Sequence, residues 1–446
     1  MKQNKSFAWT VCSIAVPVAL QSMLQSSFSM IDQIMIGQLG SVSVVGVGLA
    51  GKFSSIFSVL ASAIGAIAGI MISQYLGQKN KQEVRRSFWL NLLIVGIAAS
   101  VFTFLCILFP RQIVGLYTPD PEAILAAAGY LAILAGTFLP IAGATLLATL
   151  FRCMEKASLP LFASIAAAVV NTGLNYVLIF GKMGFPVMGA EGAAIATLVS
   201  HIVNFLIMFL LFLKYRDILS ADPGTDGPIS KFHWGQYAAM LLPILICEFM
   251  WSLGENVYAG IYGHLGTESC AAMTLTNPIQ GFMIGALCGL SQAASVIVGK
   301  RLGTEEYDEA YRASRKLIGY GLVGSFFLSA VILLIKGYYV EIYQVEDTVK
   351  LLAKQILTAY AIVAPFKVLN MILGGGIIRS GGKTQYVMII DLTGTWVFGV
   401  PLALLAAFVL KLSIPYVYFI LSLEECIRFG ISVVVFRRKH WMQILK

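Results

Sequence analysis

The chain has 446 residues, of which 58% are apolar and only 12% are charged. Its mean hydropathy is +0.82, whereas an ordinary soluble domain is about 25% charged, so the composition excludes a set of water-soluble domains. The formal net charge is +9, and the positions of the basic residues must decide whether this excess reflects nucleic-acid binding or membrane topology. The seven cysteines include no C-x-x-C pair, so we expect neither a disulfide framework nor a zinc site.

Twelve apolar runs follow one another along the chain, each long enough for a membrane helix, which needs about 20 mostly apolar residues. We predict spans at 10–36, 43–75, 88–109, 122–150, 158–181, 189–213, 235–262, 270–299, 314–336, 349–378, 385–410 and 413–436. Twelve such runs leave no amphipathic elements to cover them in water. The sequence therefore predicts an all-α integral membrane protein with twelve transmembrane helices in a lipid bilayer.

The basic residues are distributed unevenly between the predicted loops. Cytoplasmic loops of membrane proteins carry an excess of Lys and Arg. With both termini in the cytoplasm, 22 of the 31 basic residues lie on the inner side, six lie on the outer side and three lie within spans. The basic excess is thus a topology signal, and we expect no nucleic-acid partner.

The second half of the chain repeats the first. Pro17 matches Pro243 and Tyr117 matches Tyr343, each at an offset of 226 residues. Six helices per half is an even number, so both halves enter the membrane from the same side and are related by a pseudo-two-fold axis along the membrane normal. We predict an N-terminal six-helix lobe at 1–216, a cytoplasmic linker at 217–233 and a C-terminal six-helix lobe at 234–446. Two such bundles are typical of transporters.

Polar side chains fall at matching depth in the N-terminal half. An ionisable residue inside a span costs about 2.5–3.5 kcal/mol on insertion scales, which makes Asp32 a functional candidate. Asn171 and Asn175 are spaced i,i+4 and share a helix face, and Thr197 lies about eight residues into the sixth span. Oxygen ligands of this kind suit a small hard cation. They can also set the protonation of a neighbouring carboxylate. The alternative for the asparagines is interhelical hydrogen bonding.

The C-terminal half has its own charged residues within spans. Glu248 and Glu255 are seven residues apart in the seventh span and so lie on nearly the same face. Asp391 lies in the eleventh span and Lys367 in the tenth. Carboxylates that face a cavity can attract organic cations or carry protons. The alternative is a neutral structural pair between Asp391 and Lys367.

Four further charges have structural interpretations. Glu424 and Arg428 are spaced i,i+4 in the favourable order, which predicts mutual neutralisation. Lys52 can extend toward the outer surface, and Glu191 opens a helix where a carboxylate favours the N-terminus.

These positions resemble the multidrug and toxic compound extrusion (MATE) family, within the superfamily of multidrug, oligosaccharidyl-lipid and polysaccharide exporters. The resemblance covers essentially the whole chain. It is carried by VPVALQSMLQSSFSMIDQIMIGQLG (16–40), ISQYLGQKNKQEVRRS (72–87), NTGLNYVLIFGKMGFPVMGAEGAAIAT (171–197), LPILICEFMWSLGENVYAGIYGHLG (242–266) and IIRSGGKTQ (377–385).

The resemblance implies an antiporter of the bacterial plasma membrane, not an enzyme. It would export organic, mainly cationic, compounds by alternating access in exchange for protons or sodium ions, and would act as a monomer without a cofactor beyond that ion. By motif position the coupling cation, with Na⁺ as the one metal considered, would bind at Asp32, Asn171, Asn175 and Thr197. Some relatives have an aspartate where this chain has Asn175. The candidates for substrate or proton binding are Glu248, Glu255, Asp391 and Lys367.

Three other functions compete with this interpretation. A lipid-linked oligosaccharide flippase of the same superfamily should have a more basic cavity, whereas the predicted spans hold seven acids and three bases. A membrane-embedded enzyme would need a clustered nucleophile and base or metal ligands, and the sequence offers neither. A channel would not need two unequal lobes with buried carboxylates.

Overall fold

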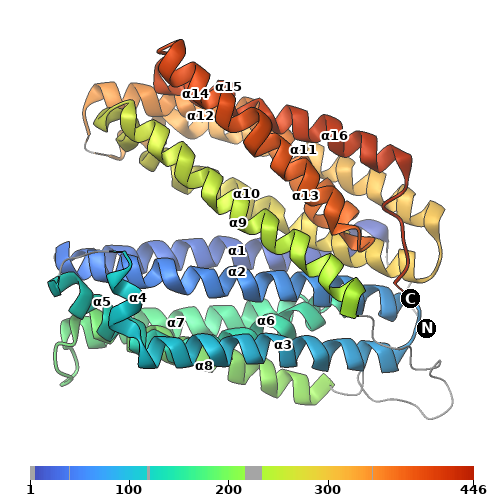
Figure 1. Ribbon diagram of the computed structural model, residues 1–446, viewed down its shortest axis with the longest axis horizontal. Coiled ribbons are helices and arrows are strands. Elements are labelled where there is room, and N and C mark those ends of the chain that lie inside the picture. Colours follow the sequence, from blue (N-terminus) through green and yellow to red (C-terminus); the bar gives the residue numbers. More distant parts are fainter. Residues whose placement is uncertain (1–5, 40, 118–120, 216–233, 344, 446) are drawn as a thin grey trace. The chain divides into compact units, whose positions relative to one another are not determined.

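The computed structural model describes residues 6–39, 41–117, 121–215, 234–343 and 345–445, and every regular element in these ranges is helical (Figure 1). The chain divides into two compact units, which are Leu20–Ser230 (the N unit) and Met1–Ala19 together with Lys231–Lys446 (the C unit). The division falls inside the first helix, two residues after Pro17. The predicted linker at 217–233 lies outside the described residues, and the predicted lobe boundaries stay predictions.

The N unit is a bundle built around the long helix α2. Its elements are the later part of α1 (Phe7–Gly37), α2 (Ser41–Gly77), α3 (Lys81–Leu108), α4 (Pro110–Gly115), α5 (Pro121–Leu134), a short 3₁₀ turn (Ala135–Thr137), α6 (Phe138–Cys153), α7 (Ser158–Phe180) and α8 (Gly189–Tyr215). Helix α2 packs against α3, α5 and α6, and α7 runs along α8. Phe57 and Phe138 are fully buried in this core, with ring centroids 4.8 Å apart.

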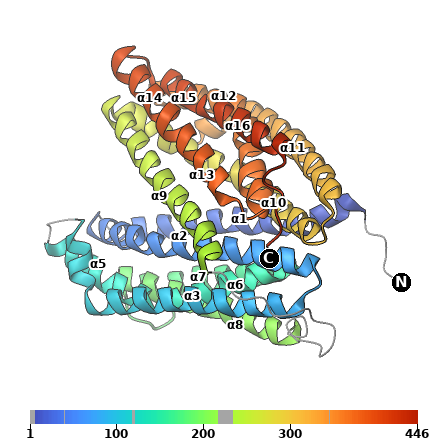
Figure 2. The same cartoon turned by 45° about the vertical axis from the view of Figure 1, so that its right-hand side comes forward.

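The C unit is a bundle in which α10 and α12 are central. Its helices are α9 (Trp234–His264), α10 (Thr267–Gly303), α11 (Tyr307–Glu341), α12 (Asp347–Asn370), α13 (Thr384–Leu392), α14 (Val400–Leu404), α15 (Ile414–Ser422) and α16 (Glu424–Arg438). Three π-helical segments, Met371–Ile378, Thr393–Gly399 and Leu405–Val409, lie between or beside these helices. Helix α12 packs against α10, α11 and α15, and α9 lies beside α13 (Figure 2).

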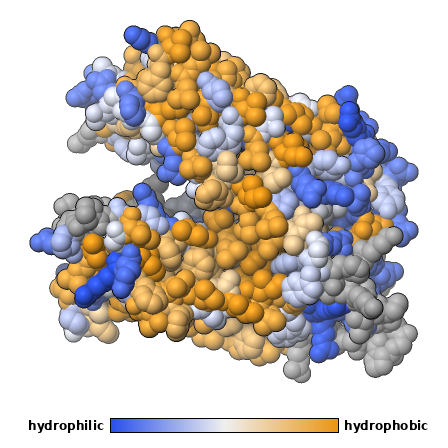
Figure 3. Space-filling view, viewed as in Figure 1, coloured by the Kyte–Doolittle hydropathy of each residue, from blue (hydrophilic) through white to orange (hydrophobic). Residues whose placement is uncertain are grey.

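The helices have the length and surface of membrane spans. Among the described residues, eleven helices are long and apolar enough to cross a membrane. Apolar side chains cover the flanks of the helices on the face shown in Figure 3, and hydrophilic residues gather near helix ends. Large apolar residues such as Phe104 (62% exposed) and Leu334 (77% exposed) face outward, as expected for contact with lipid. The predicted all-α membrane fold is confirmed.

The twelfth predicted span, 413–436, is interrupted. It forms α15 and α16, which are separated at Leu423. The apolar run continues through this point, so composition alone predicts one helix. The break makes Glu424 and Glu425 the first-turn residues of α16, where the helix dipole favours a negative charge.

A close approach between α7 and α8 positions the polar residues of the N unit. A Cβ atom placed on Gly192 would lie 2.9 Å from the carbonyl carbon and oxygen of Leu178. Only glycine allows the two backbones to come this near. Gly192 precedes Thr197 by five residues and Leu178 follows Asn175 by three, so this contact sets the spacing between the polar faces of the two helices.

We predict that Gly192→Ala destabilises the protein. The added methyl group must push α7 and α8 apart, and overpacking of this kind costs about 1–3 kcal/mol. The thermal unfolding midpoint of the purified protein in detergent should fall. Gly173→Ala on α7 is the control, because a Cβ there meets nothing within 4 Å. Equal midpoints for the two variants would contradict the assigned role of Gly192.

Candidate functional site

The first candidate site joins α1 to α7 in the N unit. Asp32 lies five residues before the end of α1, and Asn175 lies five residues before the end of α7. The Asn175 amide nitrogen donates a hydrogen bond of 2.5 Å to Asp32 Oδ1. Asn175 is 1% exposed and Asp32 is half-buried, so this charge-assisted bond lies largely out of water.

Asn171 completes a group of two amides around the carboxylate. Its spacing from Asn175 puts both on one face, and the Asn175 nitrogen lies 3.2 Å from the Asn171 amide oxygen. When the Asn171 amide is rotated so that its nitrogen faces Asp32, that nitrogen lies 2.9 Å from Oδ1 and 3.2 Å from Oδ2. The predicted convergence of Asp32, Asn171 and Asn175 is thus present in the structure. The asparagines also make the interhelical hydrogen bond that was the alternative interpretation.

Thr197 reaches this group through a tyrosine. Its hydroxyl donates to the Ala193 carbonyl at 2.9 Å, one turn earlier on α8. Tyr130 lies close to both Thr197 and Asp32 and interacts electrostatically with the Asp32 carboxylate. Tyr130 comes from α5 and is 6% exposed. Tyr130 was not among the predicted site residues, because no spacing or motif distinguishes it in a chain with eighteen tyrosines.

One oxygen in this group lacks a partner. The side-chain oxygen of Asn175 is buried and accepts no hydrogen bond from any described residue. A buried acceptor left unpaired costs about 1–3 kcal/mol. The site therefore presents a carboxylate and a free amide oxygen, a donor set that fits a small hard cation or a proton shared with Asp32.

The N unit also contains a cavity that is lined by polar and apolar residues and by no acid. Its empty space, counted together with the open solvent at its mouth, is about 850 Å³. It is lined by Gln21, Gln25, Ser58, Ala61, Ser62, Ile141, Ala144, Thr145, Ala148, Arg152, Pro160, Ser164, His201, Asn204 and Met208. Arg152 donates to the Gln21 side-chain oxygen at 3.4 Å, and the Gln21 side-chain amide nitrogen donates to the Ser164 hydroxyl at 2.8 Å. This cavity holds one guanidinium group that already has a neutral partner.

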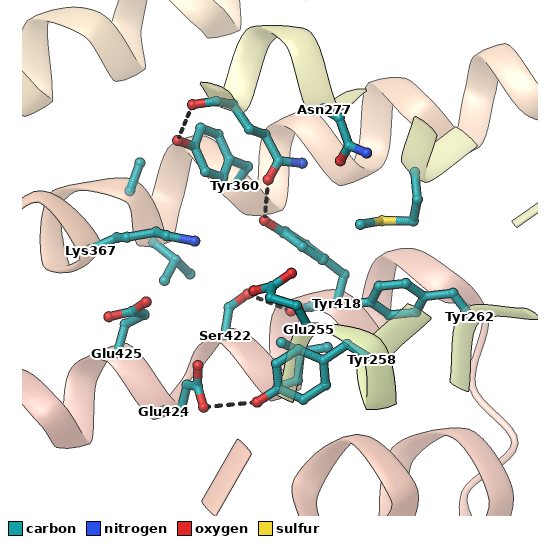
Figure 4. A pocket seen from close by; sticks show the side chains of 15 residues that line it. Glu255, Tyr258, Tyr262, Asn277, Tyr360, Lys367, Tyr418, Ser422, Glu424 and Glu425 are labelled. Carbon is teal, nitrogen blue, oxygen red and sulfur yellow. Dashed lines mark hydrogen bonds between the residues drawn. The ribbon is translucent and has the colours of Figure 1, made fainter. Parts of the chain in front are cut away.

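The C unit contains a cavity that is rich in acids and tyrosines. Its empty space, counted together with the open solvent at its mouth, is about 610 Å³, and Figure 4 shows the lining side chains. It is lined by Glu255, Tyr258, Tyr262, Met273, Asn277, Gln280, Tyr360, Val363, Ala364, Lys367, Tyr418, Leu421, Ser422, Glu424 and Glu425. The sequence predicted Glu255 and Lys367 as candidates and missed the tyrosines. The sequence spacing could have predicted two of these tyrosines. Glu255, Tyr258 and Tyr262 follow one another at i, i+3 and i+7 on α9, so they share a helix face.

Gln280 on α10 holds two of the tyrosines in place. The Tyr418 hydroxyl donates to the Gln280 side-chain oxygen at 2.9 Å, and the Tyr360 hydroxyl donates to the Gln280 carbonyl at 3.2 Å. The hydroxyl groups are thereby satisfied within the protein. The two rings line the cavity, and their hydroxyl groups need no hydrogen-bond partner from a ligand.

The two acids at the start of α16 are held from opposite sides. Tyr258 donates to Glu424 at 2.9 Å, and the Asn370 amide donates to the Glu425 carboxylate at 2.8 Å. A Cβ on Gly399 would collide with both the Glu424 carboxylate and the Tyr258 hydroxyl, so a larger residue at this position would force one or both of these side chains to move. Gly399 ends a π-helical segment, and such segments occur frequently at functional sites.

Arg428 is the cation partner of two acids beneath this cavity. Its guanidinium lies 3.5 Å from Glu424 and 3.7 Å from Asp391, and it also donates to the Thr395 hydroxyl. The predicted pairing of Glu424 with Arg428 is therefore present. The alternative pairing of Asp391 with Lys367 is wrong, because Arg428, one helix turn beyond Glu424, takes Asp391 instead.

Glu248 does not line the cavity that contains Glu255. It interacts electrostatically with Arg379 and Asp391. The two acids of α9 thus belong to different surroundings, although they share a helix face. Asp391, similarly, belongs to the Arg428 cluster rather than to the cavity lining.

Comparison with known proteins connects this architecture to one family. The family model described as MatE matches residues 17–177 and again residues 243–405. The chain belongs to the MATE transporter family. The two matches begin 226 residues apart, which is the offset of the predicted repeat.

Similar proteins span the whole chain at low identity. An uncharacterized transporter, YisQ, of Bacillus subtilis is 20% identical over 99% of this chain and 97% of its own length. A probable multidrug resistance protein, NorM, of Thermotoga maritima is 23% identical over 87% of this chain and 83% of its own length. This MATE protein is thus a multi-pass membrane transporter and not an enzyme.

Solved structures agree on the fold. A crystal structure of a MATE protein in complex with MaL6 superimposes with a TM-score of 0.88 at 18% identity, covering 97% of this chain and 96% of that one. A transporter of the MOP superfamily from Pyrococcus furiosus gives 0.86 at 17% identity over the same shares. At such identities the likeness shows the fold alone.

We predict that Arg428→Met strongly destabilises this MATE protein. The change leaves the nearly buried Glu424 without its cation, and breaking a buried ion pair from one side costs about 3–5 kcal/mol. Thermal unfolding in detergent should show a large drop in midpoint. Arg437→Met, at the exposed end of the same helix, is the control and should change the midpoint little. Similar decreases in the unfolding midpoint for both variants would show that the Arg428 ion pairs do not contribute specially to stability.

Proposed function

We propose that the protein is a cation-coupled antiporter that exports organic, mainly cationic, compounds across the plasma membrane by alternating access. It acts as a monomer with both termini in the cytoplasm. The observation that carries the proposal is the Asp32 group, in which a half-buried carboxylate meets an unpaired amide oxygen of Asn175. A group of this kind supports binding of H⁺ or Na⁺ as the driving ion.

Both amides of the site can stabilise a charged Asp32 carboxylate. The Asn175 nitrogen donates to Asp32 Oδ1, and the Asn171 nitrogen, with its amide turned toward Asp32, lies 2.9 Å from Oδ1 and 3.2 Å from Oδ2. Thr197 and Tyr130 supply neighbouring hydroxyls. Because protonation or cation binding removes or shares the negative charge that these amides stabilise, ion binding changes the hydrogen bonds between α1 and α7.

The cavity of the C unit supports binding of the exported compound. Glu255 and Glu425 attract an ammonium group, and the rings of Tyr258, Tyr262 and Tyr418 can hold a cation or an aromatic body. Export against a gradient requires only that ion and compound each bind one conformational state better than the other.

The flippase alternative is less well supported by the two cavities. A pyrophosphate group requires several free cationic donors. The N-unit cavity offers Arg152, which is bonded to Gln21, and the C-unit cavity offers Lys367 among three glutamates. Neither set of side chains suits a doubly charged anion.

The experiment that tests the proposal is dye efflux in membrane vesicles with sodium and proton gradients imposed separately. One of the two gradients should drive a cationic dye against its own concentration gradient. Dye movement that follows only its own gradient would identify a channel instead. Absence of dye movement under either gradient would overturn the proposal.

We predict that Asp32→Asn abolishes ion-driven efflux while the protein still reaches the membrane. The carboxamide keeps the size of the side chain and removes its charge, so neither a proton nor Na⁺ is held. Dye efflux and membrane abundance are measured together. Glu122→Gln, in the first turn of α5, is the matched control for loss of an acid and should transport normally. Normal efflux by Asp32→Asn would refute the assignment of this site.

We predict that Glu255→Gln weakens binding of a cationic dye about tenfold, equivalent to ~1.4 kcal/mol, because one uncompensated carboxylate leaves the cavity. Binding of a neutral compound of similar shape should change little. Glu248→Gln on the same helix should affect cation binding less, since Glu248 lies outside the cavity lining. The dissociation constants are measured by fluorescence on purified protein, and a greater effect at Glu248 would reverse the assignment.

A further inference from the structure

We propose that the C unit binds an anionic phospholipid at the end where α10 connects to α11. Arg315 and Lys316, the cation pair, are the principal contacts of the lipid headgroup, and the acyl chains lie along the outer face of α11. This inference concerns a lipid partner of the protein, and it depends neither on the exported compound nor on the driving ion.

The cation pair stands at the boundary of the apolar surface of α11. Both side chains are exposed, and no charged residue occurs between Lys316 and Lys336. At about 1.5 Å per residue these two lysines are roughly 30 Å apart along the helix, which equals the thickness of the hydrocarbon core of a bilayer. The cation pair therefore lies at the level of the phospholipid headgroups.

An exposed apolar stripe continues from Lys316 along the helix. Tyr320, Val323 and Phe327 follow it at i+4, i+7 and i+11 and so share its face. Their side chains are 40%, 71% and 67% exposed. A cation at the end of such a stripe matches a phospholipid, whose charged headgroup adjoins its acyl chains, whereas a soluble anion would leave the stripe unused.

The cation pair differs from the neighbouring arginines in having no carboxylate partner. Arg301 and Arg312 share the Glu309 carboxylate, at 3.3 and 2.5 Å. Among the described residues, no carboxylate oxygen lies within 4.0 Å of the basic group of Arg315 or Lys316. One acid thus serves two arginines, and the cation pair remains available to a phosphate group.

The acids of this connection lie farther from the apolar surface than the cation pair. They precede α11 or belong to its first turn, and they are Glu305, Glu306, Asp308 and Glu309. Lys316 lies seven residues beyond the last of them, which is about 10 Å along the helix. The connection is therefore acidic at its tip and basic at the membrane boundary.

Phe7 brings a second cation toward Lys316. The Lys316 ammonium lies 5.3 Å from the centroid of the Phe7 ring, and the Arg301 guanidinium carbon lies 5.4 Å from it. Phe7 begins α1, and its ring also lies 6.3 Å from that of Tyr320 (Figure 2). Two positive charges beside one ring repel each other, and a phosphate group that binds both offsets this repulsion.

The first half of the chain shows that membrane topology does not require the cation pair. Arg86 and Arg312 occupy equivalent positions at the offset of 226 residues, and each pairs with a glutamate three residues earlier. The positions equivalent to the cation pair hold Trp89 and Leu90. The two additional charges therefore belong to the C unit alone and call for a partner of their own.

The test compares two lipids with the same acyl chains, dioleoyl phosphatidylglycerol and dioleoyl phosphatidylcholine. Each is titrated into the purified full chain in detergent, and native mass spectrometry measures its dissociation constant. The wild type should bind phosphatidylglycerol about tenfold more tightly. Replacing the cation pair by glutamines (Arg315→Gln with Lys316→Gln) should weaken binding of phosphatidylglycerol by about tenfold and leave phosphatidylcholine unchanged.

Two further variants make the result specific. Arg437→Gln with Arg438→Gln removes the same charge from the exposed end of α16 and should keep the preference for phosphatidylglycerol. Phe7→Leu keeps an apolar side chain but removes the ring beside Lys316, and should reduce the preference roughly threefold. Unfolding midpoints in detergent check that each variant is folded, as expected for exposed cations.

Three outcomes would overturn the inference. The first is equal binding of the two lipids by the wild type, or an unchanged preference after loss of the cation pair. The second is an equal loss in the α16 variant, which would show that binding follows net charge. The third is displacement of phosphatidylglycerol by an equal concentration of glycerol phosphate, which would identify a site for soluble phosphates. Failure of the proposed transport function would leave these dissociation constants unaffected.

Discussion

The constraint that organises this molecule is the free energy of a charge in a medium that cannot solvate it. A carboxylate between apolar helices must have hydrogen-bond donors or a cation nearby. Most of the buried polar contacts in the two units supply such donors or cations to a carboxylate. Asn175 donates to Asp32, Tyr258 and Arg428 serve Glu424, and Asn370 serves Glu425. The carboxylates and their partners form the candidate site of each unit.

The two units meet this constraint in different ways. The N unit surrounds one carboxylate with neutral amides and hydroxyls, so its charge state depends on what binds there. The C unit holds several acids together with Arg428 and Lys367, and part of its charge is compensated permanently. The duplicated sequence has thus produced one neutral-lined site that suits a small ion and one polar, aromatic cavity that suits a larger molecule.

Much of the fold and part of the site could be predicted from the sequence. Apolar runs of the right length locate the spans, and the i,i+4 spacing of Asn171 and Asn175 places both on one face, because helix periodicity is local information. Tyr130 could not be found, since its proximity to Thr197 depends on how α5 packs. The break at Leu423 was also missed, because its apolar surroundings do not differ from an unbroken helix. Glu424 therefore looked like a mid-span charge, although it opens α16.

The π-helical segment Thr393–Gly399 has a mechanical consequence. It contains Thr395, which accepts from Arg428, and it ends at Gly399 beside Glu424. A π turn contains one residue more than an α turn, and each residue of an α-helix accounts for about 100° of rotation. Rewinding this segment to α geometry would turn the following helix α14 by roughly that angle about its own axis. Such a rotation would also have to break or move the contact between Thr395 and Arg428, so the Arg428 cluster and the π-helical segment are geometrically linked.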